Sequence, residues 1–248
     1  MNPAEFTNIA TAEDRMWWFA GMRKILQAWI GRMPEQPSGR VLEAGCGTGY
    51  MSRWLAENYG WRMFPLDLDF SGLAYARREG TPRLNQADLT SLPYRDGVFD
   101  AVVSLDVLVH LPEGQETQGL AEFLRVLKPG GILLLRVSAL RILRSRHSEF
   151  AHEQQRFTRS RLKRAVRQAG FQLIDASYAN SLLLPVAVLK FRIWEPLTRQ
   201  APASGVVVPS PLLNWALRQP LEWEARWLEA GGRLPLGQSV LLLAQKVR

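Results

Sequence analysis

Short apolar runs alternate along the chain with segments whose apolar residues recur at helical spacing. Such a run is typical of a strand covered on both faces, and regular alternation with helices is typical of a parallel α/β sheet. Residues 98–104 form a strongly apolar run, which favours a central position in that sheet. The predicted strands lie around Val41-Leu42 and at residues 61–67, 83–87, 98–104, 132–137, 171–178 and 239–247.

Two flanking segments carry helical patterns outside this alternation. Residues 13–33 place apolar side chains among basic ones and end at Pro34 and Pro37, which predicts one or two amphipathic helices before the sheet. Residues 181–236 separate the last two predicted strands and predict a helical cap, with four tryptophans and a proline-rich link at 202–211. Because large aromatic side chains usually pack in a core, we expect these tryptophans to be buried.

Composition narrows the class of protein. A chain of 248 residues with 47% hydrophobic and 22% charged side chains suits one folded domain with an insertion. The net charge of +8 is concentrated, because residues 141–167 hold nine basic and two acidic side chains while the remainder is nearly balanced. Cys46 is the one cysteine, so an internal disulfide and a cysteine-rich metal site are excluded, and no metal site is predicted.

Targeting signals are also absent from the sequence pattern. The first 14 residues contain acidic side chains and lack the basic and then apolar build of a secretory signal. The apolar stretch Leu182–Leu189 contains Pro185 and is followed by Lys190 and Arg192, so it is well short of the roughly 20 residues of a membrane-spanning helix. We therefore expect a cytoplasmic protein whose membrane contact, where it occurs, is peripheral.

Residues 41–50, V-L-E-A-G-C-G-T-G-Y, combine a strand end, a glycine-rich turn and the start of a helix. Glycines at 45, 47 and 49 accept backbone angles that other residues avoid, and they let a ligand approach the peptide groups at the helix start. The dinucleotide pattern G-x-G-x-x-G would need a glycine at Tyr50, and no Walker loop occurs. The turn therefore predicts a nucleotide-like ligand of another kind, with a glycine-rich turn that binds nothing as the alternative.

The run E-A-G-C-G-T-G at residues 43–49 resembles motif I of the class I S-adenosylmethionine-dependent methyltransferases. Residues 13–19 with Arg23 resemble the start of many bacterial small-molecule members, and L-K-P-G-G at 127–131 is a frequent turn in them. The resemblance covers residues 41–137 well. It implies a Rossmann-like α/β fold with a seven-stranded, mostly parallel sheet, the last strand antiparallel, helices on both faces, an N-terminal helical lid and a helical insertion before the last strand.

The resemblance implies S-adenosylmethionine as the cofactor and S-adenosylhomocysteine as the product. Asp67 ends the second predicted strand 18 residues after Gly49, where an acidic residue accepts the ribose hydroxyls, and Asp69 is expected to cap the next helix. The resemblance assigns Asp88, after the third strand, to the adenine amino group. The predicted cofactor-binding residues are Glu43, Gly45, Cys46, Gly47, Thr48, Gly49, Asp67, Leu68, Asp88, Leu89, Ser104 and Leu105.

The acceptor site is predicted beyond the strand at 132–137, because open α/β sheets bind ligands at the carboxyl ends of their strands. Arg144, Arg146 and Arg156 follow this strand and suit a carboxylate or phosphate, with a solvated arginine face as the alternative. Trp17 is the fourth predicted substrate-binding residue, as part of a lid, with packing onto the sheet as the alternative.

Three histidines, His110, His147 and His152, are the candidate bases for an acceptor that starts protonated. Many relatives have a Glu-His pair where this chain has Val109-His110. Without that neighbouring carboxylate, His110 is equally consistent with a packed histidine. Cys46 lies in the cofactor turn, which argues against a role as a nucleophile.

We therefore predict a single-domain enzyme over residues 1–248. Its expected parts are lid helices at 1–38, a cofactor-binding core at 39–180, a cap at 181–236 and the final strand at 237–248. The predicted reaction is methyl transfer from S-adenosylmethionine to an O-, N- or C-nucleophile of a small-molecule acceptor, with a carboxylate or phosphate as a candidate feature of that acceptor.

Two other function classes stay open from the sequence. The first is a methyltransferase of RNA or another nucleic acid, in which the basic stretch would bind phosphates. The chain contains no N-P-P-Y or D-P-P-Y run, which favours the small-molecule reading. The second is a protein that binds S-adenosylmethionine without transferring its methyl group, or that uses the same site for other chemistry.

Overall fold

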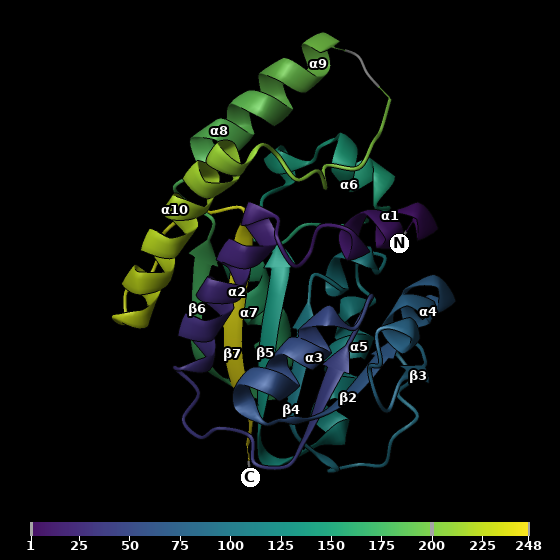
Figure 1. The fold of residues 1–248 in the computed structure, drawn as a ribbon. Helices are drawn as coiled ribbons and strands as arrows, with labels where there is room; N and C mark the ends of the chain where they lie inside the picture. The colour runs from purple at the N-terminus through teal and green to yellow at the C-terminus, as the bar shows by residue number, and fades with distance from the viewer. Residues whose placement is uncertain (1, 199–200, 248) are drawn as a thin grey trace.

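The computed structural model describes residues 2–198 and 201–247, which contain a seven-stranded sheet (Figure 1). The strand order is β3-β2-β1-β4-β5-β7-β6, and neighbours are parallel except that β7 is antiparallel to both β5 and β6. The predicted Rossmann-like α/β fold with an antiparallel last strand is confirmed. The strands span Arg40–Ala44 (β1), Arg62–Asp67 (β2), Asn85–Gln86 (β3), Phe99–Leu105 (β4), Leu127–Ser138 (β5), Phe171–Ala179 (β6) and Ser239–Lys246 (β7).

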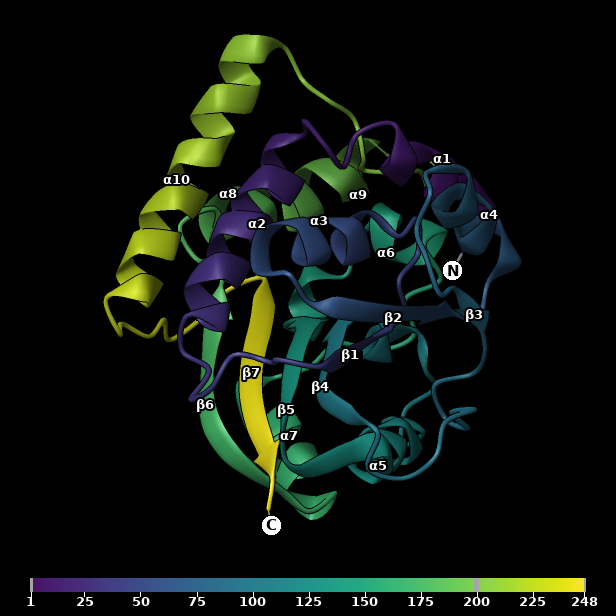
Figure 2. The same ribbon diagram turned by 60° about the horizontal axis from the view of Figure 1, so that its bottom comes forward.

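Helices cover both faces of the sheet (Figures 1 and 2). α2, α3 and α10 pack on one face, and α5 and α7 pack on the other. In the part of the chain that the structure describes, no helix is both long and apolar enough to cross a bilayer. The helices span Pro3–Ala10 (α1), Trp17–Ile30 (α2), Tyr50–Tyr59 (α3), Phe70–Arg78 (α4), Glu116–Val126 (α5), Arg146–Phe150 (α6), Arg159–Gln168 (α7), Leu184–Leu189 (α8), Glu195–Thr198 (α9) and Pro211–Glu229 (α10), with short turns at Leu108–His110 (η1) and Arg141–Leu143 (η2) and a π-helical turn at Lys190–Trp194 (η3).

Alternate residues of the central strands pack into two separate hydrophobic cores, one on each face of the sheet. In β7, Leu242 packs with the α5 and α7 side, whereas Leu241 and Leu243 pack with the α2, α3 and α10 side. Val102 and Val103 of β4 divide in the same way. This burial on both faces explains why the strands read in the sequence as continuous apolar runs rather than as alternating ones.

Two strands differ in extent from the prediction. β3 is limited to Asn85–Gln86, because Arg83 has a left-handed φ of 56° that a strand does not accommodate. β5 begins early, at Leu127, inside the predicted turn. Leu127 pairs with Phe99, and the regular ladder with β4 resumes at Ile132 after a local irregularity.

The N-terminal segment holds two helices, and α1 lies outside the predicted helical range. Its signals are local, since the Asn2 side chain accepts the Ala4 N–H at 3.0 Å and Pro3 occupies the first helical position. Phe6 is 1% exposed and lies against Gly72 of α4, where an added Cβ would be 2.7 Å from the Phe6 ring. The small residue in α4 therefore lets α1 dock on it.

The cap tryptophans are exposed, so the expectation that they pack in a core is wrong. Trp194, Trp215, Trp223 and Trp227 have between 58% and 64% of their surface exposed. α10 contacts α2 through its opposite side, on which Leu221 is fully buried. The apolar side chains of that side already fill the interface, which leaves Trp215, Trp223 and Trp227 on the outer surface of α10, whereas Trp194 belongs to η3.

α2 and α10 cross closely because Gly21 leaves space for Leu221. A Cβ added at Gly21 would lie 2.3 Å from Leu221 Cδ1 and 2.6 Å from Leu221 Cβ. Since the second of these atoms is fixed to the backbone, a rotamer change of Leu221 does not relieve the clash. The position of α10 on α2 thus depends on glycine, which has no side chain, at position 21.

Gly21→Ala is expected to lower the free energy of unfolding by about 1–3 kcal/mol, because α10 must shift to admit the methyl group. Gly31→Ala is the matched control, since Gly31 follows α2 with φ −60° and the atoms nearest to its added Cβ would be two backbone carbonyl oxygens at 3.6 Å. The control should change stability by less than about 1 kcal/mol. Urea unfolding of both variants measures the difference, and equal stabilities would contradict the close crossing.

Candidate active site

A cavity of about 1120 Å³ opens at the carboxyl ends of the parallel strands. Residues at the ends of β1, β2 and β4, including Glu43, Asp67 and Leu105, form one side of it. Parts of α1, α2, α6 and the cap line the rest, and Figure 1 shows α1 and α6 beyond these strand ends. Sites for a single drug-sized ligand have roughly 300–1,000 Å³, so this cavity has room for a cofactor and a second molecule.

The turn after β1 holds its three glycines in the left-handed region, with φ of 88°, 51° and 73° at Gly45, Gly47 and Gly49. A Cβ at Gly45 would lie 2.1 Å from a Val107 methyl group, so packing alone requires glycine there. Gly47 differs, because the nearest atom to an added Cβ is a Phe6 ring carbon at 3.7 Å and the residue lines the cavity. Gly47 is therefore the point at which a ligand has access to the backbone.

Hydrogen bonds to β2 hold this turn in place. The N–H groups of Gly45 and Cys46 donate to the carbonyl oxygen of Leu66 at 2.9 Å and 2.8 Å. The Gly47 N–H donates to Asp67 Oδ2 at 2.8 Å. Burial raises the pKa of Asp67 above its ordinary value. The Asp67 carboxylate thus joins the turn after β1 to the end of β2.

Two further aspartates bind backbone groups beside the cavity. The Asp69 N–H donates to Asp67 Oδ1 at 2.9 Å, and Asp69 Oδ1 accepts the Ser71 N–H at 2.8 Å, which confirms Asp69 as the cap of α4. Asp88 Oδ1 accepts both the N–H and the hydroxyl of Thr90 at 2.8 Å. Asp88 is exposed at the cavity wall, and its second carboxylate oxygen accepts no hydrogen bond from the described residues.

Glu43 lies buried beneath the turn, with 2% of its surface exposed. It accepts the hydroxyl hydrogen of Ser52. Burial raises the pKa of Glu43 to about 8, so the carboxyl group is largely protonated at neutral pH. Burial also raises the pKa of the Cys46 thiol, which keeps this thiol un-ionised and unsuited to nucleophilic attack.

The N-terminal segment closes over the glycine turn through Glu13. The Thr48 hydroxyl lies 2.6 Å and 2.8 Å from the two carboxylate oxygens of Glu13, which is 8% exposed. Burial raises the pKa of Glu13. Arg23 donates to the Glu13 carbonyl oxygen at 2.5 Å and lies over the Tyr50 ring at 4.9 Å. Glu13 and Arg23 were not among the predicted site residues, although their run resembles the family's N-terminal segment.

The three histidines have different surroundings. His110 lines the cavity, its Nδ1 lies 3.3 Å from the His152 carbonyl oxygen, and burial lowers its pKa. His147 lines the cavity as well, and its Nδ1 lies 3.5 Å from Oε1 of Glu5, a carboxylate with 1% exposure. The Gly205 N–H donates to the same ring nitrogen at 3.2 Å. Among the three histidines, His147 is the one whose ring lies within 4 Å of a carboxylate in the described residues.

Glu5 is a site residue that the sequence reasoning missed. It belongs to α1 and accepts hydrogen bonds from Asn8 Nδ2 at 2.9 Å and Ser204 Oγ at 3.1 Å. The second of these residues lies in the link between α9 and α10. A single acidic residue near the N-terminus gives no sequence signal for these contacts, because His147 and Ser204 lie about 140 and 200 positions further along the chain.

His152 is not among the cavity-lining residues, and neither is Arg144. His152 follows α6 with a left-handed φ of 56°, and Arg144 is exposed beside η2. Arg146 and Arg156 do line the cavity, as does Trp17. Of the four residues predicted to bind the acceptor, three therefore meet at the cavity and Arg144 does not.

The two predicted acceptor arginines that line the cavity both bind glutamates. Arg156 Nε lies 2.7 Å from Glu153 Oε2, and its guanidinium also donates to the Ala139 carbonyl at 3.1 Å. Arg146 Nε lies 3.8 Å from Glu195 Oε2, and the Arg146 N–H donates to the same oxygen at 2.9 Å. Any anion bound in the cavity would share these arginines with the protein's own carboxylates.

Most of the predicted cofactor residues meet at the cavity. Those that line it are Glu43, Gly45, Cys46, Gly47, Thr48, Asp67, Leu68, Asp88, Leu89 and Leu105. Gly49 and Ser104 do not. Gly49 is the N-cap residue before α3 and packs toward Thr81, whereas the Ser104 hydroxyl is buried and donates to the Ala44 carbonyl at 3.0 Å.

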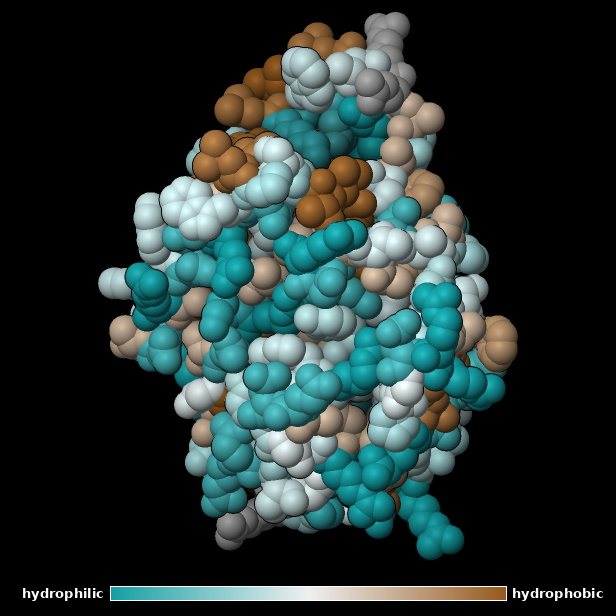
Figure 3. Space-filling model, in the orientation of Figure 1, coloured by the Kyte–Doolittle hydropathy of each residue, from teal (hydrophilic) through white to brown (hydrophobic). Residues whose placement is uncertain are grey.

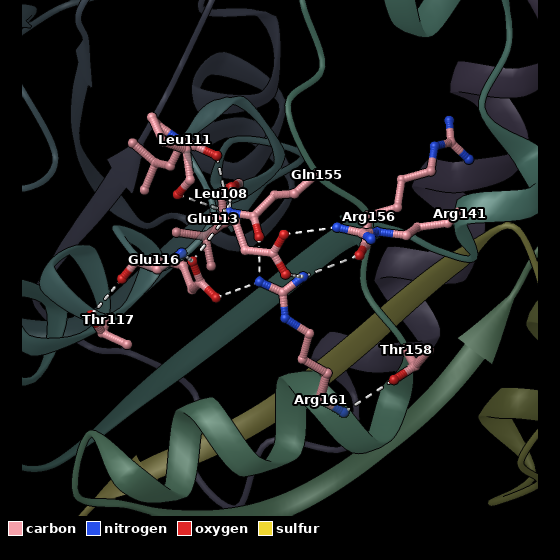
Figure 4. A network of polar contacts seen from close by, with 12 residues as sticks. Leu108, Leu111, Glu113, Glu116, Thr117, Arg141, Gln155, Arg156, Thr158 and Arg161 are labelled. Atoms are coloured by element: carbon pink, nitrogen blue, oxygen red, sulfur yellow. Dashed lines mark hydrogen bonds and ion pairs between the residues drawn. The ribbon is translucent and has the colours of Figure 1, made fainter.

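Much of the charge of residues 141–167 is used inside the protein (Figure 4). Arg161 binds Glu116 at 2.5 Å and Glu113 at 3.5 Å, and it also donates to Gln155. Gln155 in turn donates to the carbonyl oxygens of Leu108 and Leu111 at 3.2 Å and 3.0 Å. This network fixes η1, and with it His110, to the segment before α7.

Comparison with known proteins agrees with this geometry. Residues 42–135 match the family model described as a methyltransferase domain. A protein of Mycolicibacterium smegmatis named probable S-adenosylmethionine-dependent methyltransferase is 35% identical over 125 residues, which cover 49% of this chain and 46% of that protein. The malonyl-[acyl-carrier protein] O-methyltransferase of Enterobacter lignolyticus is 36% identical over 112 residues, which cover 45% of this chain and 43% of that protein.

The fold has similar solved structures. One is a chain from the complex between the Haloferax volcanii Trm112 methyltransferase activator and a methyltransferase, with a TM-score of 0.64, 22% identity and coverage of 99% of this chain and 94% of that chain. At this identity the likeness concerns the fold alone. The alignments to both curated relatives cover less than half of their length.

The core of the chain is therefore a methyltransferase domain of the class I S-adenosylmethionine-dependent enzymes. S-adenosylmethionine is the cofactor of this class. The resemblance carried by the glycine turn is confirmed at the level of the family. The roles of individual residues, and the division of the chain into lid, core, cap and final strand, stay predictions.

Glu43 should make the protein less stable as the pH rises. Its pKa of about 8 in the folded state exceeds the ordinary value of 4.5, so the folded state binds more protons than the unfolded state between these two values. The free energy of unfolding therefore falls as the pH rises through that window. In Glu43→Gln the side chain stays neutral at every pH. The decrease in the free energy of unfolding between about pH 5.5 and about pH 7.5 should therefore be smaller than in the unaltered protein by roughly 1 kcal/mol or more.

Urea unfolding at the two pH values measures this difference. Glu57→Gln, at an exposed position of α3, is the matched control and should keep the slope of the unaltered protein. The same pH dependence in both variants would contradict a protonated, buried Glu43.

Proposed function

We propose that the protein transfers the methyl group of S-adenosylmethionine to a small-molecule acceptor. The observation that carries this proposal is the cavity itself, in which the residues of the glycine turn and of the β2 end face the same space as the Glu5–His147 pair and the cap. A cofactor held on the strand side would present its methyl group to an acceptor held on the other side. The protein need supply little more than alignment of the two reactants.

We assign the cofactor to the residues at the ends of β1, β2 and β3. Asp67 would accept the ribose hydroxyls, because its carboxylate is fixed by Gly47 and Asp69 and lines the cavity. Asp88 would accept the adenine amino group with the carboxylate oxygen that Thr90 leaves free. Gly47 would give the cofactor access to the backbone of the turn. When bound, S-adenosylmethionine supplies an electrophilic methyl group on a sulfonium.

We assign the general base to His147, with Glu5 as its positioning residue. Glu5 Oε1 and the Gly205 N–H compete for Nδ1 of the ring. When the proton is on Nδ1 it faces Glu5, and Nε2 is then the basic atom that takes the proton of an acceptor hydroxyl or amine as the methyl group arrives. His110 is the second candidate. Its Nδ1 faces the His152 carbonyl oxygen, which would also leave Nε2 as the basic atom, but burial lowers its pKa and makes it a weaker base.

The acceptor we propose is a small molecule with an apolar part. Aromatic residues are common in the cavity wall: Phe6, Trp17, Trp18, Phe19, Phe191 and Trp194. A carboxylate or phosphate on the acceptor would meet Arg146 and Arg156, in competition with Glu195 and Glu153. The reacting atom is an O-, N- or C-nucleophile, and the first two need the base when they start protonated.

The nucleic-acid alternative has less support than the small-molecule reading. Arg141, Arg156 and Arg161 of the basic stretch pair with glutamates at 2.5–2.7 Å, which leaves less charge for phosphates than the sequence suggests. The other alternative, binding of S-adenosylmethionine without methyl transfer, is separated from the proposal by the formation of S-adenosylhomocysteine.

Asp67→Ala is expected to weaken S-adenosylmethionine binding by roughly 10–100-fold, because a charged acceptor for two hydroxyls is lost. Asp69→Ala is the matched control. It removes the cap of α4, which should cost about 1 kcal/mol of stability while changing the affinity much less. Isothermal titration calorimetry measures both affinities, and an unchanged value for Asp67→Ala would remove the ribose assignment.

His147→Gln and Glu5→Gln are expected to lower kcat, the first by ~10²–10⁴-fold at neutral pH, while leaving S-adenosylmethionine affinity within about twofold. His152→Asn is the matched control, because His152 lies outside the cavity-lining set and asparagine tolerates its left-handed backbone. The readout is S-adenosylhomocysteine formed with a panel of small hydroxyl, amine and carboxylate acceptors. Absence of this product with every acceptor would contradict methyl transfer, and full activity of His147→Gln would contradict the base.

A further inference from the structure

The outer side of the segment from α8 to α9 carries an apolar stripe that nothing in the described chain covers. Its residues recur every three or four positions, which places them along one side of a helical segment. Each has between 51% and 75% of its surface exposed. The stripe consists of Val186, Leu189, Ile193 and Leu197, and Leu182 extends it in the turn just before α8. Figure 3 shows hydrophobic residues gathered at this end of the molecule, over α8 and α9.

We propose that this stripe docks on an anionic membrane surface and that docking brings the cavity mouth to the lipid. This goes beyond the proposed function, because it concerns where the protein works and not which reaction it performs. Contiguous exposed apolar surface is uncommon on proteins without a partner for it. A helical segment with an apolar outer side and neighbouring basic residues suits the boundary between lipid headgroups and acyl chains.

The charges of the segment favour an anionic lipid surface over a second copy of the chain. Lys190 and Arg192 are exposed, and no ion pair joins either of them to an acidic side chain within residues 2–198 and 201–247. Glu195, the one acidic residue of the segment, is partly buried and binds Arg146. A symmetric dimer through this stripe would bring basic side chains together without acidic partners. Long basic side chains reach headgroup phosphates while their methylene groups stay near the apolar layer.

The same segment also borders the cavity. Phe191, Trp194 and Glu195 line it, so the inner side of the segment faces the cavity while the outer side carries the stripe. Lys190 also lines the cavity and is exposed, which places it at the boundary between the two sides. Trp194 is 64% exposed as well, which places it at the rim. Tryptophan at such a position is typical of the interface between membrane and water. An acceptor taken from the membrane surface would therefore pass this rim on its way into the cavity.

Vesicle flotation with the full chain tests the proposal without any methyl acceptor. The protein should bind vesicles of phosphatidylcholine mixed with phosphatidylglycerol roughly tenfold more tightly than vesicles of phosphatidylcholine alone. The double variant Ile193→Glu with Leu197→Glu should lose at least about tenfold of this binding. Val247→Glu is the matched control, since Val247 is 58% exposed near the C-terminus, at the opposite end of the molecule from α9 (Figure 1).

Calorimetric S-adenosylmethionine affinity of the double variant serves as the folding check and should equal that of the unaltered protein. No binding to anionic vesicles, equal binding to both lipid compositions, or unchanged binding by the double variant would each overturn the proposal. The proposal would also be overturned if the unaltered protein formed a dimer in solution without vesicles and the double variant were a monomer, because a second copy would then cover the stripe. Failure of methyl transfer, in contrast, would leave the vesicle result intact, so the two proposals fail separately.

Discussion

The Asp67 carboxylate is the interaction on which the candidate site depends. It accepts the N–H groups of Gly47 and Asp69, which ties the glycine turn after β1 to the end of β2. The Gly45 and Cys46 N–H groups add two bonds to the carbonyl oxygen of the residue before Asp67. The turn is thereby held in its left-handed conformation by the protein alone. A ligand at Gly47 would meet a backbone that needs no rearrangement.

The remainder of the cavity is assembled from segments that are far apart in the sequence. Glu13 of the N-terminal segment binds Thr48 in the turn, and Glu5 of α1 meets both His147 of α6 and Ser204 of the cap link. These contacts are polar and nearly all at buried carboxylates, where an unpaired group would be costly. The N-terminal segment therefore connects the glycine turn on one side of the cavity with α6 and the cap link on the other, as the predicted lid would.

The same physical reasoning explains which sequence predictions failed. Net charge over residues 141–167 counts side chains without their partners, and Arg156 and Arg161 are bound by Glu153 and Glu116. Tryptophan content predicted burial, yet Trp223 and its neighbours on α10 are exposed because the opposite side of that helix already fills the contact with α2. Composition reports how much apolar or charged surface exists, while the packing of elements decides which of it is covered.

The sequence by itself determined the sheet, the class of enzyme and most of the residues on the strand side of the cavity, where we propose that the cofactor binds. These features follow from local patterns, since apolar runs specify buried parallel strands and glycines at 45, 47 and 49 specify a turn with left-handed angles. Only the tertiary structure decided the opposite side of the cavity, where we propose that the acceptor binds. Glu5 became a partner of His147, and Arg144 and His152 were left outside the cavity-lining set, because such contacts depend on how distant helices pack and no local pattern encodes them.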